Sequence, residues 1–321
     1  MLKWGIIGPG AIANSFAKEV HNVGCIVKAV YGRNENKVNK FAEEYNIEKR
    51  YTDIDEFLRD EEVEAVYIAT PHRHHMEFAE KCINSKKHIL CEKPFSYNYS
   101  TAEQILKKAE ENELFVMEAL WTLFLPAINQ AKRWIEEGQI GKIKLITVNF
   151  GFKSEENKEG RLYNPSLAGG ALLDVGIYPI LLANYLLGEV PEKIEARGTM
   201  NSTGVDETDL INLKYKEGAL ASLTCSIAAD TDNTAVIYGE KGKISIPFFW
   251  MAKKAILDNG KEVVFEDSYE EAGYKYEIEE AAKCIFDNKI ESVSASHKVT
   301  LELAEIMDEI RRQIGLVYPF E

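Results

Sequence analysis

Residues 3–13 read KWGIIGPGAIA, an apolar run that leads into the turn Gly8-Pro9-Gly10-Ala11-Ile12-Ala13. The turn fits the pattern G-x-G-x-x-G/A between a strand and a helix. Its first glycine permits a tight turn, and its second lets the backbone approach a pyrophosphate. The small third residue allows close packing of helix on strand. We therefore expect Gly8, Gly10, Ala11 and Ile12 to bind a dinucleotide at a helix N-terminus.

Strand and helix patterns alternate through the rest of residues 1–120. Asp53 precedes one of the expected helices with Glu56 three residues later, which is the spacing of a capping box. Such alternation indicates βαβ units and a parallel sheet, so residues 1–120 are expected to form a Rossmann domain. The expected strands are Lys3–Ile7, Ile26–Tyr31, Ala65–Ala69, His88–Cys91 and Leu114–Met117.

The pattern changes near Lys142, where longer runs of alternating residues begin. Turn pairs such as Glu217-Gly218 and Asn259-Gly260 separate several of these runs, which is typical of an antiparallel sheet. The fold class is therefore α/β: a Rossmann domain followed, over residues 121–321, by an α+β domain. This second domain is expected to hold a large, mostly antiparallel sheet, to bind substrate and to mediate oligomerisation.

Composition and charge exclude several classes of protein. The formal net charge of −14 over 321 residues leaves no basic surplus to neutralise phosphates, so we expect no nucleic-acid partner. No apolar run of about 18 residues stands out, and no signal peptide is apparent, so we expect no membrane partner. Five scattered cysteines without a CxxC pair indicate reduced, buried thiols in a cytoplasmic protein.

The end of the second expected strand bears on the choice of cofactor. An NAD site usually places Asp or Glu there, to bond the ribose 2′-hydroxyl. This chain has Tyr31-Gly32-Arg33-Asn34 instead. Arg33 could pair with a 2′-phosphate, so we expect NADP, with NAD as the alternative. The competing interpretation is a solvated arginine at the start of a helix.

Two further motifs follow expected strands, Thr70-Pro71-His72 and Glu92-Lys93-Pro94. Both fall at the edge where open α/β sheets bind ligands. We expect the named residues other than Pro94, together with His75, to contact the cofactor. Lys93 could also donate to a substrate hydroxyl and favour an alkoxide. No metal is expected, because the histidines lack a matching set of Cys or His ligands elsewhere.

A third motif, Gly169-Gly170-Ala171-Leu172-Leu173-Asp174-Val175-Gly176-Ile177-Tyr178, lies in an expected helix. Asp174 and Tyr178 have i, i+4 spacing and so share a helix face. Together with Lys93 from the other domain they could form a proton-transfer group. The alternative is a packing tyrosine beside a hydrogen-bonded aspartate.

Taken together, these motifs resemble those of the Gfo/Idh/MocA family of oxidoreductases, over essentially the whole chain, and most closely its dihydrodiol and NADP-dependent D-xylose dehydrogenase branch. The residues that carry the resemblance to that branch are Thr70-Pro71-His72, Cys91-Glu92-Lys93-Pro94, Met117-Glu118-Ala119-Leu120-Trp121-Thr122, Gly176-Ile177-Tyr178-Pro179 and Tyr318-Pro319-Phe320-Glu321.

The resemblance implies that Lys93, Asp174 and Tyr178 are the catalytic residues. We also expect Trp121, Phe152 and Tyr178 to contact the substrate. One departure is Leu123, where that branch often has arginine. It implies a less polar or differently shaped substrate pocket.

These observations predict an NAD(P)-dependent oxidoreductase that transfers hydride between the nicotinamide and a hydroxyl of a sugar, polyol or cyclic diol. Tyr178 would take the hydroxyl proton, assisted by the positive charge of Lys93, although the sequence leaves open which of the two is the base. Asp174 would orient Lys93 or the substrate. The alternatives are a nicotinamide-using sugar hydrolase of the same fold and a non-catalytic dinucleotide-binding sensor.

The sequence also predicts a homodimer or higher homo-oligomer that is joined through the second domain's sheet. Residues 219–229 contain no charge. Leu220, Ser222, Thr224 and Ser226 would face one side of the strand, and the small or apolar residues between them would face the other. A strand that is neutral on both faces suits burial on both faces. Symmetric dimers are the commonest solution for soluble proteins.

Overall fold

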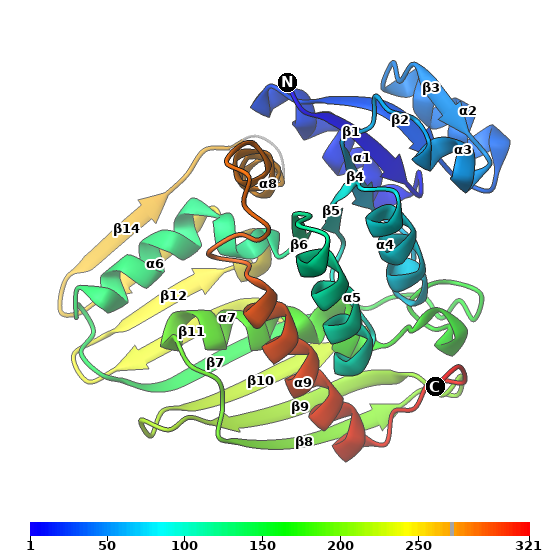
Figure 1. Ribbon diagram of the computed structural model, residues 1–321. Helices are drawn as coiled ribbons and strands as arrows, with labels where there is room; N and C mark the ends of the chain where they lie inside the picture. Colours follow the sequence, from blue (N-terminus) through cyan, green and yellow to red (C-terminus); the bar gives the residue numbers. More distant parts are fainter. Residues whose placement is uncertain (270–272) are drawn as a thin grey trace. The chain divides into compact units, whose positions relative to one another are not determined.

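Six parallel strands in the order β3-β2-β1-β4-β5-β6 form one of two sheets in the computed structural model, which describes residues 1–269 and 273–321 (Figure 1). This order is that of a Rossmann fold, with a crossover between β1 and β4 that creates a ligand crevice at the carboxyl ends of the strands. The strands are β1 Lys3–Ile7, β2 Ile26–Tyr31, β3 Lys49–Tyr51, β4 Ala65–Ile68, β5 His88–Cys91 and β6 Val116–Glu118.

Helices cover the parallel sheet, and capping side chains fix where several of them begin. Every residue of β4 is buried, as expected for a strand between two helical layers. Asp53 accepts hydrogen bonds from the backbone N–H groups of Asp55 and Glu56, which confirms the predicted helix cap. The helices are α1 Ala11–Glu19, α2 Glu35–Glu44, α3 Ile54–Leu58, α4 His75–Asn84, α5 Tyr99–Glu111 and α8 Lys275–Phe286.

The second sheet has eight strands in the order β14-β13-β12-β11-β7-β10-β9-β8. Neighbouring strands are antiparallel except β7 and β10, which run parallel. The expected large, mostly antiparallel sheet is therefore confirmed. The strands are β7 Ile143–Gly151, β8 Lys193–Met200, β9 Asp206–Lys214, β10 Leu220–Ser226, β11 Thr234–Gly239, β12 Lys243–Pro247, β13 Lys254–Asp258 and β14 Glu262–Glu266.

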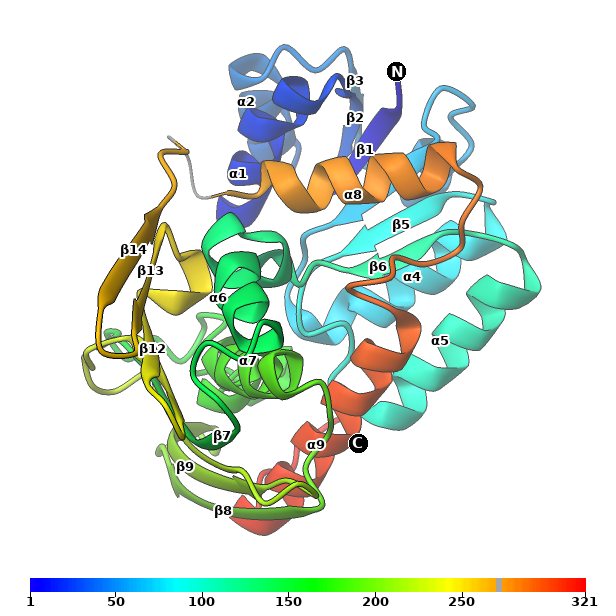
Figure 2. The ribbon, with the colours of Figure 1, turned by 90° about the vertical axis from the view of Figure 1, so that its left-hand side faces the viewer.

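Two helices of the second domain, α6 Pro126–Glu136 and α7 Ile177–Leu187, lie on one face of the second sheet, which Figure 2 shows edge-on. Burial alternates accordingly: Ala221 and Leu223 are buried, whereas Leu220 and Leu210 on the opposite face are 50% and 55% exposed. Within the described chain, this outer face carries exposed apolar side chains that no helix of the domain covers.

The chain contributes to each domain in two pieces. The first domain comprises residues 1–121 and 273–301, and the second comprises residues 122–269 and 302–321. The division expected at residue 121 assigned all later residues to the second domain. The structure differs because α8 packs beside α1 in the first domain (Figure 2). The helix α9, His297–Ile314, begins in the first domain and continues in the second.

Some elements were not expected from the sequence. The strand β3 is only three residues long, and β13 and β14 follow one another with little polar alternation. The segment Pro165–Leu187 is long and apolar enough to cross a membrane by length and composition, a run that the sequence analysis did not single out. In this chain 89% of its most apolar window is buried in the protein, as in the core helix of a domain.

Candidate active site

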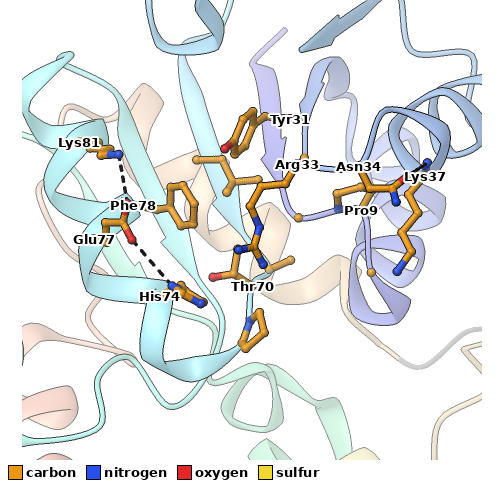
Figure 3. A pocket seen from close by; sticks show the side chains of 16 residues that line it. Pro9, Tyr31, Arg33, Asn34, Lys37, Thr70, His74, Glu77, Phe78 and Lys81 are labelled. Atoms are coloured by element: carbon orange, nitrogen blue, oxygen red, sulfur yellow. Dashed lines mark hydrogen bonds and ion pairs between the residues drawn. The ribbon is translucent and has the colours of Figure 1, made fainter. Parts of the chain in front are cut away.

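A pocket of about 360 Å³ lies in the first domain at the carboxyl ends of β1, β2 and β4 (Figure 3). It therefore occupies the crevice that the strand order predicts. Of the expected cofactor residues, Gly8, Gly10, Arg33, Thr70 and Pro71 line it directly. The other lining residues are Ile7, Pro9, Tyr31, Gly32, Asn34, Lys37, Ala69, His74, Glu77, Phe78 and Lys81.

The glycine turn forms one wall of the pocket. Gly8 has φ +95°, and a Cβ there would lie 2.8 Å from the carbonyl oxygen of Ala69. A larger residue would therefore be both strained and obstructed. Gly10 is the N-cap of α1 and makes no side-chain cap, and the space above its Cα is open. Ala11 and Ile12 form the first helical turn, whose N–H groups suit a pyrophosphate.

The pocket is rich in basic groups. Arg33 reaches across the pocket from the end of β2, and Lys37 follows on α2 (Figure 3). His74 and Lys81 lie at the start and on one face of α4, with Glu77 between them. Glu77 accepts a hydrogen bond from Lys81 at 3.1 Å, and this bond lowers the pKa of its carboxyl group.

Glu77, Phe78 and Lys81 of α4 were not predicted as cofactor contacts. His74, Glu77, Phe78 and Lys81 all line the pocket. Their spacing of three and four residues places them on one helix face. Once one of them had been identified as a pocket residue, this spacing would have identified the others.

The loop after β4 supplies a polar group without a protein partner. Among the described residues, the buried hydroxyl oxygen of Thr70 makes no hydrogen bond, although Thr70 lines the pocket. An unpaired buried hydroxyl is costly, and a bound polar ligand would satisfy it. The glycine turn, the open helix start, the basic groups and this hydroxyl together fit a dinucleotide.

His75, a predicted cofactor contact, lies outside the lining of this pocket. It is fully buried, with Nδ1 2.9 Å from the carbonyl oxygen of Pro94 and Nε2 2.8 Å from that of Thr70. Burial lowers the pKa of its imidazole to about 4. The ring therefore braces the loops after β4 and β5, and His72 packs edge-on against it, outside the pocket lining.

Lys93 lies directly after β5 and is half-buried, beside a cis peptide bond to Pro94. Buried polar groups hold the two residues that follow Lys93 in place. The backbone N–H of Phe95 donates to the carboxylate of Glu118 at 2.7 Å, and Pro94 contacts His75 as described. The position of Lys93 is therefore set by buried polar groups on β6 and α4.

Glu92, another predicted cofactor contact, is buried. Its carboxylate accepts hydrogen bonds from the hydroxyl of Tyr67 and from the backbone N–H of Lys93. Burial, and then the nearby Glu92, raise the pKa of Glu277 on α8 well above its usual range. Neither carboxyl oxygen of Glu277 has a hydrogen-bond partner among the described residues. Glu277 lies about 180 residues along the chain from Glu92, and no sequence signal joined them.

Glu118 is fully buried and should make the stability of the protein depend on pH. Burial raises the pKa of its carboxyl group from 4.5 to about 7. A raised pKa gives stability that is complete below pH 4.5 and is lost as the pH rises through 7. Between these values the wild type should lose about 3 kcal/mol relative to Glu118→Gln, at about 1.4 kcal/mol per pH unit. Urea unfolding of both proteins at pH 4.5, 6 and 8 measures the difference, and parallel stability curves would contradict it.

The motif with Asp174 and Tyr178 lies in the second domain, and its helix is not regular. Leu172–Gly176 form a π-helical turn, and α7 begins at Ile177. This corrects the expectation of one α-helix with simple i, i+4 spacing. Asp174 is buried and pairs with the guanidinium of Arg161. Single π-helical turns occur often at functional sites. Arg161 was not predicted, because it lies in an irregular segment.

Tyr178 contacts a cluster of aromatic side chains through Phe150. The ring of Phe150 meets Tyr178 edge-on at 5.5 Å and stacks on Trp250 at 4.1 Å between centroids. Phe152, an expected substrate contact, lies at the border of this cluster, 6.4 Å from Phe150. Trp121, the other expected contact, is buried in the first domain and stacks on Tyr274. Lys93 thus belongs to the first domain, and Asp174 and Tyr178 to the second.

The cysteines and histidines of the described chain form no metal centre. All five cysteines are buried and free. No group of three or more His, Cys, Asp or Glu side chains in the described residues could hold a metal ion.

Family models cover most of the chain. Residues 2–120 match the model described as an oxidoreductase family with an NAD-binding Rossmann fold. Residues 128–245 match the model of the GFO/IDH/MocA C-terminal domain. The chain belongs to the Gfo/Idh/MocA family of oxidoreductases. This confirms the resemblance on which the sequence analysis relied, and with it the nicotinamide-dependent class of chemistry.

Full-length relatives in this family have named activities. The trans-1,2-dihydrobenzene-1,2-diol dehydrogenases of Danio rerio and Mus musculus are 35% and 33% identical to the chain, over 99% of it and 98% of their own length. Among solved structures, a levoglucosan dehydrogenase in complex with NADH and levoglucosan superimposes with a TM-score of 0.89 at 21% identity, over 98% of this chain and 97% of that one. A 3-ketoreductase from Actinomadura kijaniata with NADP and TDP-benzene gives 0.88 at 22% identity, over 98% of each chain. Both structural matches show the same fold.

Proposed function

We propose that this family member is an NADP-dependent dehydrogenase that oxidises a secondary hydroxyl group of a cyclic diol or a sugar. The observation that carries the cofactor preference is Arg33, which lines the dinucleotide pocket at the end of β2, where NAD enzymes usually place a carboxylate. The substrate class rests on the activity named for the relatives that are more than 30% identical.

Each part of the pocket would hold one part of the cofactor. The glycine turn and the start of α1 would bind the pyrophosphate, and the Thr70 hydroxyl would bond a polar group of the dinucleotide. Arg33, assisted by Lys37, would pair with the 2′-phosphate. When bound, the nicotinamide accepts the hydride from the substrate or returns it.

The protein's own groups would handle the proton. We assign proton transfer at the substrate hydroxyl to Tyr178 and Lys93, and the ammonium of Lys93 would stabilise the alkoxide. Asp174 would orient Lys93 or the substrate, and its pairing with Arg161 holds its carboxylate in one direction. The aromatic cluster that Tyr178 contacts through Phe150 would supply an apolar surface for a carbocyclic or sugar ring.

The direct test is turnover. The purified protein is incubated with trans-1,2-dihydrobenzene-1,2-diol, D-xylose, other aldoses and inositols, each with NADP and with NAD, and formation of the reduced nicotinamide is followed by absorbance. Reduction of NADP by a diol or aldose supports the proposal. Hydrolysis of a sugar derivative without net change in free NADP(H) would indicate the hydrolase. Cofactor binding without turnover of any of these compounds would indicate the sensor.

Arg33→Ala should selectively weaken NADP. The expected loss is about 1.5–3 kcal/mol in binding, the range for hydrogen bonds to charged groups, with little change for NAD. Titration calorimetry with both cofactors measures it. Arg59→Ala removes an exposed arginine that does not line the pocket and serves as the matched control. Equal losses of affinity for NADP and NAD in Arg33→Ala would contradict the assignment of Arg33 to the 2′-phosphate.

We also propose a cytoplasmic homodimer, with no membrane or nucleic-acid partner. The outer face of the second sheet supports the dimer, because Leu210 and Leu220 are exposed on it. Apolar surface of this kind is commonly buried between symmetric copies. Light scattering at micromolar concentration should give twice the chain mass of 36.3 kDa. A monomer mass that cofactor leaves unchanged would reject the dimer.

A further inference from the structure

Two buried aspartates on β9 form an acid pair beneath the π-helical turn of the second domain. Asp206 and Asp209 are both fully buried, and their carboxyl groups lie within hydrogen-bond reach of each other. Asp209 also accepts a hydrogen bond from the thiol of Cys225 on β10, at 3.5 Å. The three side chains form a continuous polar chain, which we call the acid–thiol chain.

The acid–thiol chain contacts the π-helical turn at the start and at the end of the turn. The backbone N–H of Leu172, at the start of the turn, donates to Oδ2 of Asp206 at 2.5 Å. Gly176, at the end of the turn, packs against Cys225 so closely that a Cβ would lie 2.9 Å from its sulfur. Asp174 lies between these two anchors.

Two other glycines make room for the acid pair. A Cβ on Gly170 would lie 1.9 Å from Oδ1 of Asp206, and a Cβ on Gly198 would lie 2.3 Å from Oδ1 of Asp209. Nearby, the hydroxyl of Tyr318 donates to the carbonyl oxygen of Gly169 at 2.8 Å. The segment that enters the turn is therefore fixed from the sheet and from the C-terminal residues of the same domain.

One proton between the two carboxyl groups explains their contacts. Neither Oδ1 atom of the pair accepts a bond from a conventional donor among the described residues. Burial raises the pKa of both groups, and that of Asp209 to about 9. Asp206 accepts the Leu172 N–H and so is suited to keep the charge, whereas Asp209 keeps the proton.

The other titratable groups around the pair do not ionise in the same range. Burial raises the pKa of Cys225 and that of Tyr318 well above their usual values. The guanidinium of Arg311 on α9 lies over the ring of Tyr318. A change in kcat near pH 9 that arises from this cluster is therefore assigned to the acid pair.

We propose that the acid–thiol chain is a positioning unit that holds the π-helical turn, and with it Asp174 and Tyr178, in the geometry for proton transfer. This inference rests on the proposed function. Asp206 and Asp209 act through the backbone of the turn and touch neither substrate nor cofactor. While Asp209 is protonated, it donates to Asp206 and the pair carries one charge. Once both are ionised they repel each other, and the anchor at Leu172 loosens.

Variants of Asp209 test the proposal. Asp209→Asn retains an N–H donor of similar size but cannot ionise, whereas Asp209→Ala removes the donor. Turnover of trans-1,2-dihydrobenzene-1,2-diol with NADP is measured from pH 6 to 10, with amide hydrogen exchange over residues 169–178. We expect Asp209→Ala to lower kcat at least ~10-fold at pH 7, with NADP affinity unchanged and exchange at Leu172 accelerated. Asp209→Asn should restore most of kcat and remove any fall in kcat near pH 9 that the wild type shows.

Ile211→Ala is the matched control, since it removes a buried side chain two residues further along the same strand face. It should lower the unfolding temperature without accelerated exchange at Leu172. Unchanged exchange and kcat in Asp209→Ala, or equal effects in Ile211→Ala, would overturn the positioning role. If Asp209→Ala does not fold, the pH profile of Asp209→Asn decides. A fall in its kcat near pH 9 like that of the wild type would overturn the positioning role. Absence of wild-type turnover rejects the proposed function instead, and the exchange measurement still tests the anchor.

Discussion

Lys93→Met and Tyr178→Phe are each expected to lower kcat by at least ~100-fold, the lower range for loss of an acid–base group. The affinity for NADP should change little, because the pocket is lined by other residues of the first domain. In the proposed mechanism, removing the ammonium would leave the alkoxide without a positive charge, and removing the phenol would leave the substrate proton without its acceptor. Single-turnover kinetics with saturating NADP separate this chemical step from binding.

The double variant Lys93→Met/Tyr178→Phe should be little slower than the worse single variant, because groups that act as one unit are not additive. Tyr185→Phe on the same helix and Lys86→Met on the surface of the first domain are the matched controls. Both should retain near wild-type kcat. A full multiplicative loss in the double variant would show that Lys93 and Tyr178 work independently.

Gly170→Ala should destabilise the second domain by about 3–5 kcal/mol, the range for overpacking combined with backbone strain. Gly170 has φ +124°, a conformation that side chains rarely adopt, and the new methyl group would overlap the buried carboxylate of Asp206. The carboxylate cannot move aside without breaking its bond to the Leu172 N–H. Chemical denaturation followed by circular dichroism measures the loss.

Gly204→Ala isolates the contribution of backbone strain. Gly204 also has a positive φ, +93°, but no atom lies within 4 Å of a Cβ built there. Its replacement should cost only about 1 kcal/mol. If Gly170→Ala costs no more than Gly204→Ala, the carboxylate does not occupy the space above Gly170.

The sequence predicted most of what depends on local pattern. Residues 3–13, which end in the Gly8–Ala13 motif, specify a strand, a turn and the start of a helix within eleven residues, and the alternation after them specifies the parallel sheet. Arg33, Thr70 and Pro71 were expected in the pocket because carboxyl ends of parallel strands share one edge, and the structure places them there. The chemistry assigned to Lys93, Asp174 and Tyr178 came from the family resemblance and stays a prediction.

What the sequence did not predict depends on long-range packing. His75 was grouped with the ligand contacts by its position, but its burial is decided by the loops that close over it. Glu277 meets Glu92 only because α8 returns to the first domain. Asp206 and Asp209 have the i, i+3 spacing of ordinary strand residues on opposite faces, so a β-pattern separates them. A bulge near Met200, where β8 pairs with Asp206, accompanies their convergence.

The return of residues 273–301 to the first domain has a consequence for how the chain is made. The edge strand β6 is bonded to residues that come much later in the chain. The N–H of Val116 donates to the carbonyl oxygen of Ile290, and the carbonyl oxygen of Val116 lies 3.0 Å from Nε2 of His297. The carboxylate of Glu118 accepts a hydrogen bond from the hydroxyl of Thr300. During synthesis on the ribosome, β6 emerges long before these partners exist. An open sheet edge is a template for pairing with other chains. In the nascent first domain, the β6 edge of the sheet therefore lacks these partners until nearly the whole polypeptide has been translated.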